Sequence, residues 1–404
     1  MNTETNQKTN WRNLVYTLLI VAVVILALTF PQPFRQVGDF QLKALIVPLL
    51  QLIMLGMGTT MSLADFSEVA KQPRAVLIGL ICQFSIMPFM GYFLAKTFGF
   101  PPEIAAGVIL IGCSPSGLAS NVMCFIAKAN VALSITITSL ATLLAPLLTP
   151  ALMKLLAGEF IAVSFWAMMI DILQIVILPV VVGLLLNRLF RQSAVLLNRV
   201  MPLVSMAGIV LIVGIITAAG RDSLLTVGWA LALCVLLHNL SGFVLGYGSA
   251  RLLGLPEQSC RTVAIEVGLQ NGGLASGLAL QMGKVATVGL APALFGPIMN
   301  TTGSLLATFW TFAERYQAAH KAAPDLQSAW VFDAVTVLAR AIRDAGGTEP
   351  GRIRAALLAI RGHMGAEGEY NFDANGDGLH GYNVVKNDGG KVVFVRRVDF
   401  PAAG

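Results

Sequence analysis

The chain has 404 residues, of which 56% are hydrophobic and 12% are charged, and its mean hydropathy is +0.75. Soluble domains carry about 25% charged residues, so this composition excludes an ordinary soluble protein and predicts that a lipid bilayer surrounds the chain. The net charge of +6 does not indicate nucleic-acid binding, because the basic residues are scattered between apolar runs.

Ten apolar segments are long enough to cross a bilayer, which takes about 20 residues. They lie near 14–30, 43–63, 75–98, 104–127, 131–156, 161–186, 202–220, 225–250, 258–282 and 285–312. No small-residue cleavage site follows the first segment, so we expect a retained helix. The five cysteines lack metal-ligand spacing and lie mostly within these segments, so we expect small buried side chains. The sequence predicts an all-α polytopic membrane domain over residues 1–317.

The basic residues also predict the orientation of the helices, because cytoplasmic loops carry an excess of Lys and Arg. With the N-terminus in the cytoplasm, twelve basic residues fall on the inner side and six on the outer side. The outer six are Arg35, Lys43, Lys96, Lys154, Arg221 and Lys284. We therefore expect both termini to be cytoplasmic.

The two halves of the membrane domain share one sequence pattern. The matching features lie 155 or 156 residues apart: Gly91-Tyr92 with Gly246-Tyr247, the Gly-Leu-Ala-Ser runs that begin at Gly117 and Gly273, and Lys128 with Lys284. The offset covers five helices, an odd number, so the second copy enters the membrane from the opposite side. The pattern predicts a 5+5 inverted repeat, an arrangement typical of transporters.

Glu266 lies inside an apolar segment, where a charged side chain costs about 2.5–3.5 kcal/mol on insertion scales. Gln270 and Asn271 follow it, and Gly272-Gly273 should break the helix there. Unwound backbone exposes carbonyl oxygens, which suit a small hard cation. We therefore expect Glu266 to hold a cation; the alternative is a protonated or hydrogen-bonded side chain that faces another helix.

The first copy offers neutral oxygens beside a matching break at Pro115. Ser134 and Thr138 are four residues apart, so their hydroxyls share one helix face. The candidate ligands of this copy are the side chains of Ser120, Asn121, Ser134 and Thr138. Neutral oxygens with one carboxylate indicate Na⁺, and a proton on Glu266 is the alternative.

These motifs give the chain a specific resemblance over residues 11–315. SPSGLASN at 114–121 and EVGLQNGGLA at 266–275, supported by 130–150 and 238–247, resemble the bile acid:sodium symporters and their bacterial homologues. The resemblance implies ten helices: a panel domain of helices 1, 2, 6 and 7, and a core domain of helices 3–5 and 8–10. It also implies that broken helices 4 and 9 cross where they unwind, and that the protein lies in a bacterial inner membrane.

The same resemblance implies two sites for co-transported Na⁺. The first would use Ser120, Asn121, Ser134, Thr138 and Glu266. The second would use Gln83, Glu266, Gln270 and the backbone oxygens of Val267 and Leu269. All the side chains that these sites require are present.

The substrate side departs from the family pattern of Pro-Gly-Gly followed by a hydroxyl residue, because Leu118 replaces the hydroxyl residue. The expected substrate contacts are Ser116, Gly117, Asn271 and Asn300, and a bond between helices is the alternative role of Asn300. N-termini of half-helices favour anions. We therefore expect sodium-coupled import of a small organic anion, without nucleic acid or an obligate protein partner.

Residues 318–404 contain no segment that could span a bilayer. Residues 329–398 resemble the C-terminal end of a periplasmic branched-chain amino-acid-binding protein, and only that fragment is present. We predict a small α+β appendage, a partial lobe without its original function.

Three other functions are alternatives to sodium-coupled import. One is a proton-coupled or efflux carrier of the same architecture, and another is a membrane sensor that uses the C-terminal tail. An intramembrane hydrolase with His238 and Ser120 or Ser276 is disfavoured, because the chain has no Gly-x-Ser-x-Gly elbow.

Overall fold

The computed structural model describes residues 19–20, 22–60, 71–189, 191–320, 326–361, 363–364, 369–372, 378–379, 382–388 and 391–398. The chain divides into two compact units, Met1–Ala307 and Thr308–Gly404. The division falls inside the last long helix of the membrane domain, before the 317/318 boundary that composition suggests.

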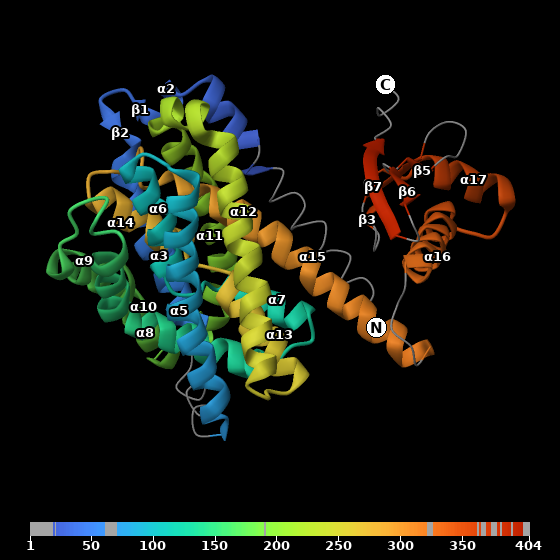
Figure 1. Ribbon diagram of the computed structural model, residues 1–404, viewed down its shortest axis with the longest axis horizontal. Coiled ribbons are helices and arrows are strands. Elements are labelled where there is room, and N and C mark those ends of the chain that lie inside the picture. The colour runs from blue at the N-terminus through green and yellow to red at the C-terminus, as the bar shows by residue number, and fades with distance from the viewer. Residues whose placement is uncertain are drawn as a thin grey trace. The chain divides into compact units, whose positions relative to one another are not determined.

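The first unit is built of helices, coloured from blue to orange in Figure 1. Residues 22–29 are helical, and a 3₁₀ turn spans Leu42–Leu45. The early elements are α2 (Gln32–Arg35), the antiparallel pair β1 (Gln36–Val37) and β2 (Phe40–Gln41), α3 (Ile46–Thr60), α5 (Pro73–Phe98), α6 (Pro102–Cys113), α7 (Ala119–Ile126) and α8 (Val131–Leu156). Then follow α9 (Phe165–Ile172), a π-helical segment Leu173–Ile177, α10 (Leu178–Leu189), α11 (Arg191–Ala219), α12 (Arg221–Leu252), α13 (Glu257–Gly268), α14 (Gly272–Gln281) and α15 (Leu290–His320).

Five helical stretches among the described residues are long and apolar enough to cross a membrane. They are Leu42–Thr59, Pro73–Phe98, Val131–Leu156, Phe165–Leu189 and Arg221–Leu252, and Pro102–Cys113 and Val204–Ala219 are shorter apolar helices. The membrane-protein class predicted from composition is therefore confirmed.

The outer face of α5 shows why these helices suit lipid. Leu77, Ile81, Phe89 and Phe93 are each more than half exposed and recur every four residues or a multiple of four, so they form one stripe. Ser85 interrupts the stripe, and its hydroxyl donates to the Ile81 carbonyl at 2.6 Å. A polar side chain that satisfies itself within its own helix can face hydrocarbon.

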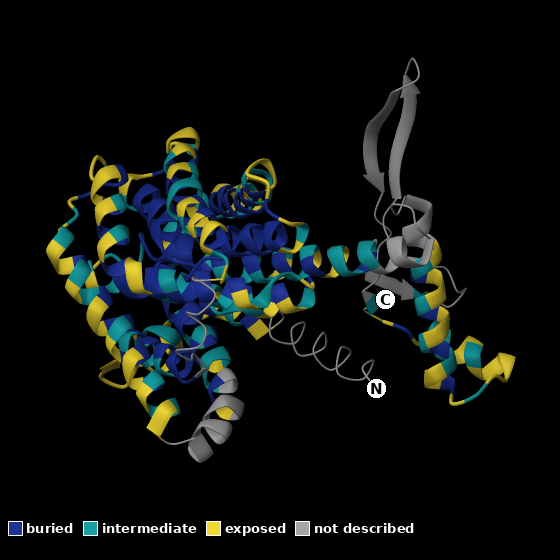
Figure 2. Ribbon diagram, turned by 90° about the horizontal axis from the view of Figure 1, so that it is seen from below, coloured by how far each residue is buried: buried dark blue, intermediate teal, exposed yellow. Residues whose placement is uncertain are grey.

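The helices of this unit form two packing groups. In one group α12 packs against α5 and α13, and α5 also contacts α6 and α8; in the other, α3 packs against α10 and α11. Figure 2 shows buried residues gathered in the middle of the helical unit. The first halves of the two broken helices are the most buried: all residues of 104–113 and of 259–268 are buried.

Glycines bring backbones together at the same place in each half. A Cβ on Gly91 of α5 would lie 2.9 Å from the Val108 carbonyl of α6, and a Cβ on Gly246 of α12 would lie 3.1 Å from the Val263 carbonyl of α13. Each pair therefore packs closely only because the side chain is absent.

The helices α7 and α14 end in the same way. The matching bonds are Lys128 N–H to Phe125 O and Ala129 N–H to Cys124 O in α7, and Gly283 N–H to Leu280 O and Lys284 N–H to Ala279 O in α14. Lys128 and Gly283 have the left-handed φ values of 50° and 70°. The structural counterpart of Lys128 is thus Gly283, one residue before the Lys284 that sequence comparison pairs with it.

The second unit contains helices and strands. Its helices are α16 (Leu326–Ala345) and α17 (Pro350–Leu358), and its strands are β3 (His363–Met364), β4 (Glu369–Phe372), β5 (Gly378–Leu379), β6 (Tyr382–Asp388) and β7 (Lys391–Val398). The strands pair antiparallel as β3-β4-β5 and β6-β7. Val337, Ala341 and Ile360 form a small apolar core between α16 and the end of α17.

Candidate functional site

Both broken helices stop for local reasons. Pro115 has no N–H to continue α6, and it holds Ser114 in an extended conformation with ψ 151°. In the second copy α13 ends at Gly268, and Asn271 caps α14 by accepting a backbone N–H of its first turn at 3.0 Å. Each break leaves irregular backbone inside the buried part of the unit.

The two breaks lie against each other. Ser116 and Gln270 form an isolated antiparallel β-bridge, and the Asn271 N–H donates to the Pro115 carbonyl at 2.8 Å. Gly117 lies so close that a Cβ there would be 3.3 Å from the Gln270 carbonyl oxygen. The crossing therefore satisfies backbone groups that unwinding has freed, as a membrane interior requires.

The carboxylate of Glu266 lies at this crossing, fully buried among hydroxyl groups. Its Oε2 accepts from Ser116 Oγ at 2.6 Å and from Thr138 Oγ1 at 2.8 Å, and its Oε1 accepts from Ser134 Oγ at 2.5 Å. No ion pair to Glu266 is found among the described residues. The structure thus brings Glu266 of the second copy together with hydroxyls of the first copy.

The remaining predicted oxygens complete this cluster. Ser120 Oγ lies 3.2 Å from Thr138 Oγ1, and Ser134 Oγ lies 2.8 Å from Asn121 Oδ1. Ser134 Oγ donates its one proton to the Glu266 carboxylate and can accept from the Asn121 amide, so the three side chains lie in one chain of polar contacts. Among the described residues no three His, Cys, Asp or Glu side chains could hold a metal ion, so any ion here depends on hydroxyls, amides and one carboxylate.

A second group of oxygens lies next to the first. Gln83 Nε2 donates to Ser114 O at 3.0 Å and to Gln270 Oε1 at 2.8 Å, and Gln270 Nε2 donates to Val267 O at 2.7 Å. Gln83 Oε1 is buried, and none of the described residues hydrogen-bonds to it. Turning the Gln83 amide over would set its oxygen against two acceptors, so the free oxygen belongs to this arrangement. Leu269, whose carbonyl is the last predicted ligand, is also fully buried.

The four residues that were expected to contact the substrate lie in three different places in the structure. Ser116 lies in the Glu266 cluster, and Gly117 and Asn271 lie at the crossing of the breaks, where Asn271 is 7% exposed. Asn300 on α15 is half-buried, and no hydrogen bond of its side chain is found among the described residues. Leu118, which replaces a hydroxyl residue of the family pattern, is half-buried beside Gly117.

Sequence reasoning did not predict the contacts of two residues of α12. His238 Nε2 lies 2.8 Å from the Met87 carbonyl oxygen of α5, and Asn239 Nδ2 donates to Gly268 O at the second break at 2.8 Å. Within the part of the chain that the structure describes, His238 Nδ1 has no partner, so neither ring nitrogen binds Ser120 or Ser276, and the hydrolase arrangement is not formed.

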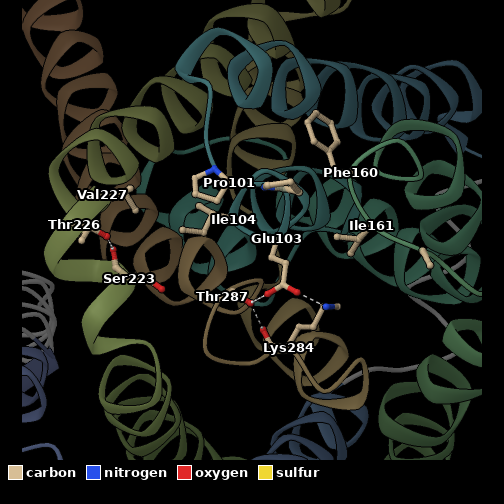
Figure 3. A pocket seen from close by; sticks show the side chains of 12 residues that line it. Pro101, Glu103, Ile104, Phe160, Ile161, Ser223, Thr226, Val227, Lys284 and Thr287 are labelled. Carbon is tan, nitrogen blue, oxygen red and sulfur yellow. Dashed lines mark hydrogen bonds and ion pairs between the residues drawn. The ribbon is translucent and has the colours of Figure 1, made fainter.

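A cavity of about 600 Å³ occurs away from these residues, at the start of α6 and the loop before α15. Figure 3 shows Glu103, Lys284 and Thr287 turned toward one another at its wall. The Lys284 ammonium pairs with the Glu103 carboxylate, which also accepts from Thr287 Oγ1 at 2.6 Å. None of the predicted sodium or substrate residues lines this cavity.

Known proteins resemble a large part of this chain. The profile of the Sodium Bile acid symporter family matches residues 47–227. The uncharacterized sodium-dependent transporter YocS of Bacillus subtilis is 40% identical over 297 residues, 73% of this chain and 90% of the relative. The probable chloroplastic sodium/metabolite cotransporter BASS1 of Arabidopsis thaliana is 36% identical over 261 residues, 65% of each chain. The probable chloroplastic sodium/metabolite cotransporter BASS3 of Oryza sativa is 34% identical over 297 residues, 72% of this chain and 69% of the relative.

The apolar helices and these relatives define the chain as a sodium-coupled membrane transporter and not an enzyme. It belongs to the sodium bile acid symporter family.

Proposed function

We propose that this protein imports a small organic anion together with Na⁺ by alternating access. The observation that carries the proposal is the buried Glu266 carboxylate, which lies at the crossing of two broken helices and is faced by three hydroxyl groups. An intramembrane acid without a cationic side chain as partner calls for a bound ion. The printed names of the relatives favour Na⁺ as that ion.

Two Na⁺ would bind, both in contact with Glu266. The first would be held by Ser120, Asn121, Ser134, Thr138 and Glu266, and the second by Gln83, Gln270, Glu266 and the carbonyls of Val267 and Leu269. The partnerless Gln83 Oε1 supports the second site, because a buried oxygen without a hydrogen donor is an available cation ligand. The contacts of the Ser134 and Thr138 hydroxyls with Glu266, and of Asn121 with Ser134, support the first site.

Alternating access would come from ten transmembrane helices arranged as a 5+5 inverted repeat. Two structural matches support the repeat. The left-handed residues that end α7 and α14, Lys128 and Gly283, are 155 residues apart, and so are the close-packed glycines Gly91 and Gly246. The panel domain would be formed by helices 1, 2, 6 and 7, and the core domain by helices 3–5 and 8–10. The two packing groups, α3 with α10 and α11 and α5 with α6, α8, α12 and α13, are consistent with this division.

The substrate would be a small organic carboxylate that binds near Gly117, Asn271 and Asn300. The short helices α7 and α14 begin at the crossing and present N–H groups and partial positive charge there. Two Na⁺ entering with one monoanion would carry one net positive charge inward, which gains about 2.3 kcal/mol per 100 mV of membrane potential.

The protein would lie in a bacterial inner membrane with both termini in the cytoplasm, as the excess of basic residues on that side indicates. The tail of residues 318–404 would take no part in transport, and no obligate protein partner would be needed.

Uptake into proteoliposomes of the full-length protein tests this function. A panel of labelled keto acids, hydroxy acids and bile salts would be offered with an inward Na⁺ gradient, with choline in place of Na⁺, and with a pH gradient alone. We expect accumulation of at least one anion with Na⁺ only. Uptake that persists in choline and follows the pH gradient would instead favour a proton-coupled carrier, in which Glu266 holds a proton among its hydroxyls.

A further inference from the structure

An amide side chain lies beside each helix break. Gln83 on α5 and Asn239 on α12 are both fully buried. Each donates to a backbone carbonyl at a helix break, Gln83 Nε2 to Ser114 O at 3.0 Å and Asn239 Nδ2 to Gly268 O at 2.8 Å. The two residues therefore secure the two breaks in a similar way.

The amides differ in what their oxygen contacts. Gln83 Oε1 has no partner, whereas Asn239 Oδ1 accepts from Thr302 Oγ1 of α15 at 2.5 Å. The Asn239 orientation follows from its surroundings, because turning the amide over would set its oxygen against the Gly268 carbonyl. Thr302 must then donate its one proton to Asn239, although two carbonyls of its own helix lie at 2.9 and 3.2 Å.

We propose that Asn239 and Thr302 are positioning residues for the second sodium site. They hold the Gly268 carbonyl, and with it the peptide planes on either side, whose Val267 and Leu269 carbonyls are the proposed ligands. The proposal rests on the sodium sites of the proposed function. Asn239 itself would not touch the ion, because its oxygen accepts from Thr302, whereas Gln83 Oε1 has no partner among the described residues and is available as a ligand.

The packing of α12 supports this role. A Cβ on Gly242, one turn after Asn239, would lie 2.9 Å from the Gly268 Cα and 3.1 Å from the Val267 carbonyl oxygen. The backbone of α12 is therefore held against the end of α13 where the carbonyls turn outward. Residues that orient ion ligands through hydrogen bonds typically change ion affinity by about 10- to 100-fold when removed.

Binding of ²²Na⁺ to the purified full-length protein, with choline as the background cation, tests the inference. We expect Thr302→Val to raise the Kd for Na⁺ about 10-fold and Asn239→Leu about 10- to 100-fold, with the amount bound at saturation unchanged. Thr302→Ser keeps the hydroxyl and should restore the original Kd. Thr301→Val is the matched control, because the exposed Thr301 hydroxyl bonds to Pro297 O of its own helix at 2.9 Å.

Comparing these variants with Glu266→Gln shows whether a negative result overturns the positioning role alone or the sodium sites as well. If Glu266→Gln still binds ²²Na⁺ as the original protein does, the sodium sites themselves are wrong. If Glu266→Gln loses binding but Thr302→Val and Asn239→Leu keep the original Kd, only the positioning role is overturned. Should Asn239→Leu fail to fold, the Thr302 pair decides: equal Kd values for Thr302→Val and Thr302→Ser would reject the inference, even if Thr302→Val lowers the Tm.

Discussion

Ser116 and Gln270 pair as a β-bridge between the two broken helices, and each also contacts one half of the oxygen cluster. Ser116 Oγ lies 2.6 Å from Glu266 Oε2, and Gln270 Oε1 accepts from Gln83 Nε2 at 2.8 Å. The bridge thus joins the two proposed sodium sites through the backbone. A shift of one broken helix against the other would change both sites together.

The hydroxyl of Thr138 should matter for Na⁺ affinity, whereas that of Thr142, one turn later, should not. Thr138 Oγ1 bonds to Glu266 Oε2 at 2.8 Å, but Thr142 Oγ1 bonds to the Thr138 carbonyl of its own helix at 2.8 Å. Hydrogen bonds to charged groups contribute about 1.5–3 kcal/mol. We expect Thr138→Val to raise the Kd for Na⁺ about tenfold or more and Thr142→Val to leave it nearly unchanged, as measured by ²²Na⁺ binding. Equal effects of the two variants would remove Thr138 from the site.

Asn300 should contribute to substrate affinity and little to stability. No hydrogen bond of its half-buried side chain is found among the described residues, so Asn300→Ala loses none within that part of the chain. We expect a KM for the transported anion about tenfold higher, since a bond to a charged ligand contributes about 1.5 kcal/mol or more, with the Tm and the Kd for Na⁺ unchanged. A lowered Tm with an unchanged KM would indicate that Asn300 instead links two helices.

Alanine substitutions at two glycines of α12 should change the stability of the protein in opposite directions. A Cβ on Gly242 would lie 2.7 Å from Met87 Sδ and 2.9 Å from Gly268 Cα, whereas nothing lies within 4 Å of a Cβ on Gly248. We expect Gly242→Ala to destabilise the protein by about 1–3 kcal/mol and Gly248→Ala to stabilise it by up to about 1 kcal/mol. Thermal unfolding in detergent measures both, and a Gly242→Ala variant as stable as the original protein would contradict the close packing of α12 on α13.

The tail should be dispensable for transport. A truncated protein that lacks residues 321–404 keeps α15 whole, and the buried oxygen cluster lies entirely in the first unit. We expect the same uptake rate and the same Na⁺ dependence as the full chain, measured in proteoliposomes at equal protein density. Loss of uptake from a correctly folded truncated protein would show that the tail acts in transport, and loss of only a cellular response would favour the sensor role.

Local chemistry made much of the site predictable from sequence. Pro115 identified the first break, and the four-residue spacing of Ser134 and Thr138 placed both hydroxyls on one face, where each contacts Glu266. The second break was predicted too late in the chain, because it lies at 269–271 and Gly272-Gly273 begin α14, which Asn271 caps. These inferences depended only on how one segment folds by itself.

Contacts between segments could not be predicted in this way. Ser116, expected beside the substrate, lies 2.6 Å from Glu266 because the two breaks pair across the crossing. Asn239 escaped notice because its partner, the Gly268 carbonyl, is a backbone group that the sequence does not mark. The match of Lys128 with Lys284 was displaced by one residue, because the helix ends are set by left-handed residues and not by side-chain identity.

The central claim is that Glu266 binds Na⁺ at the crossing of the broken helices. Equilibrium binding of ²²Na⁺ to purified wild-type and Glu266→Gln protein, in a choline background and with folding checked by thermal unfolding, tests it most directly. We predict saturable binding to the wild type, a rise in its Tm with Na⁺ of the kind that ligand binding to the folded state produces, and neither effect in Glu266→Gln. Equal ²²Na⁺ binding by the two folded proteins would contradict the claim.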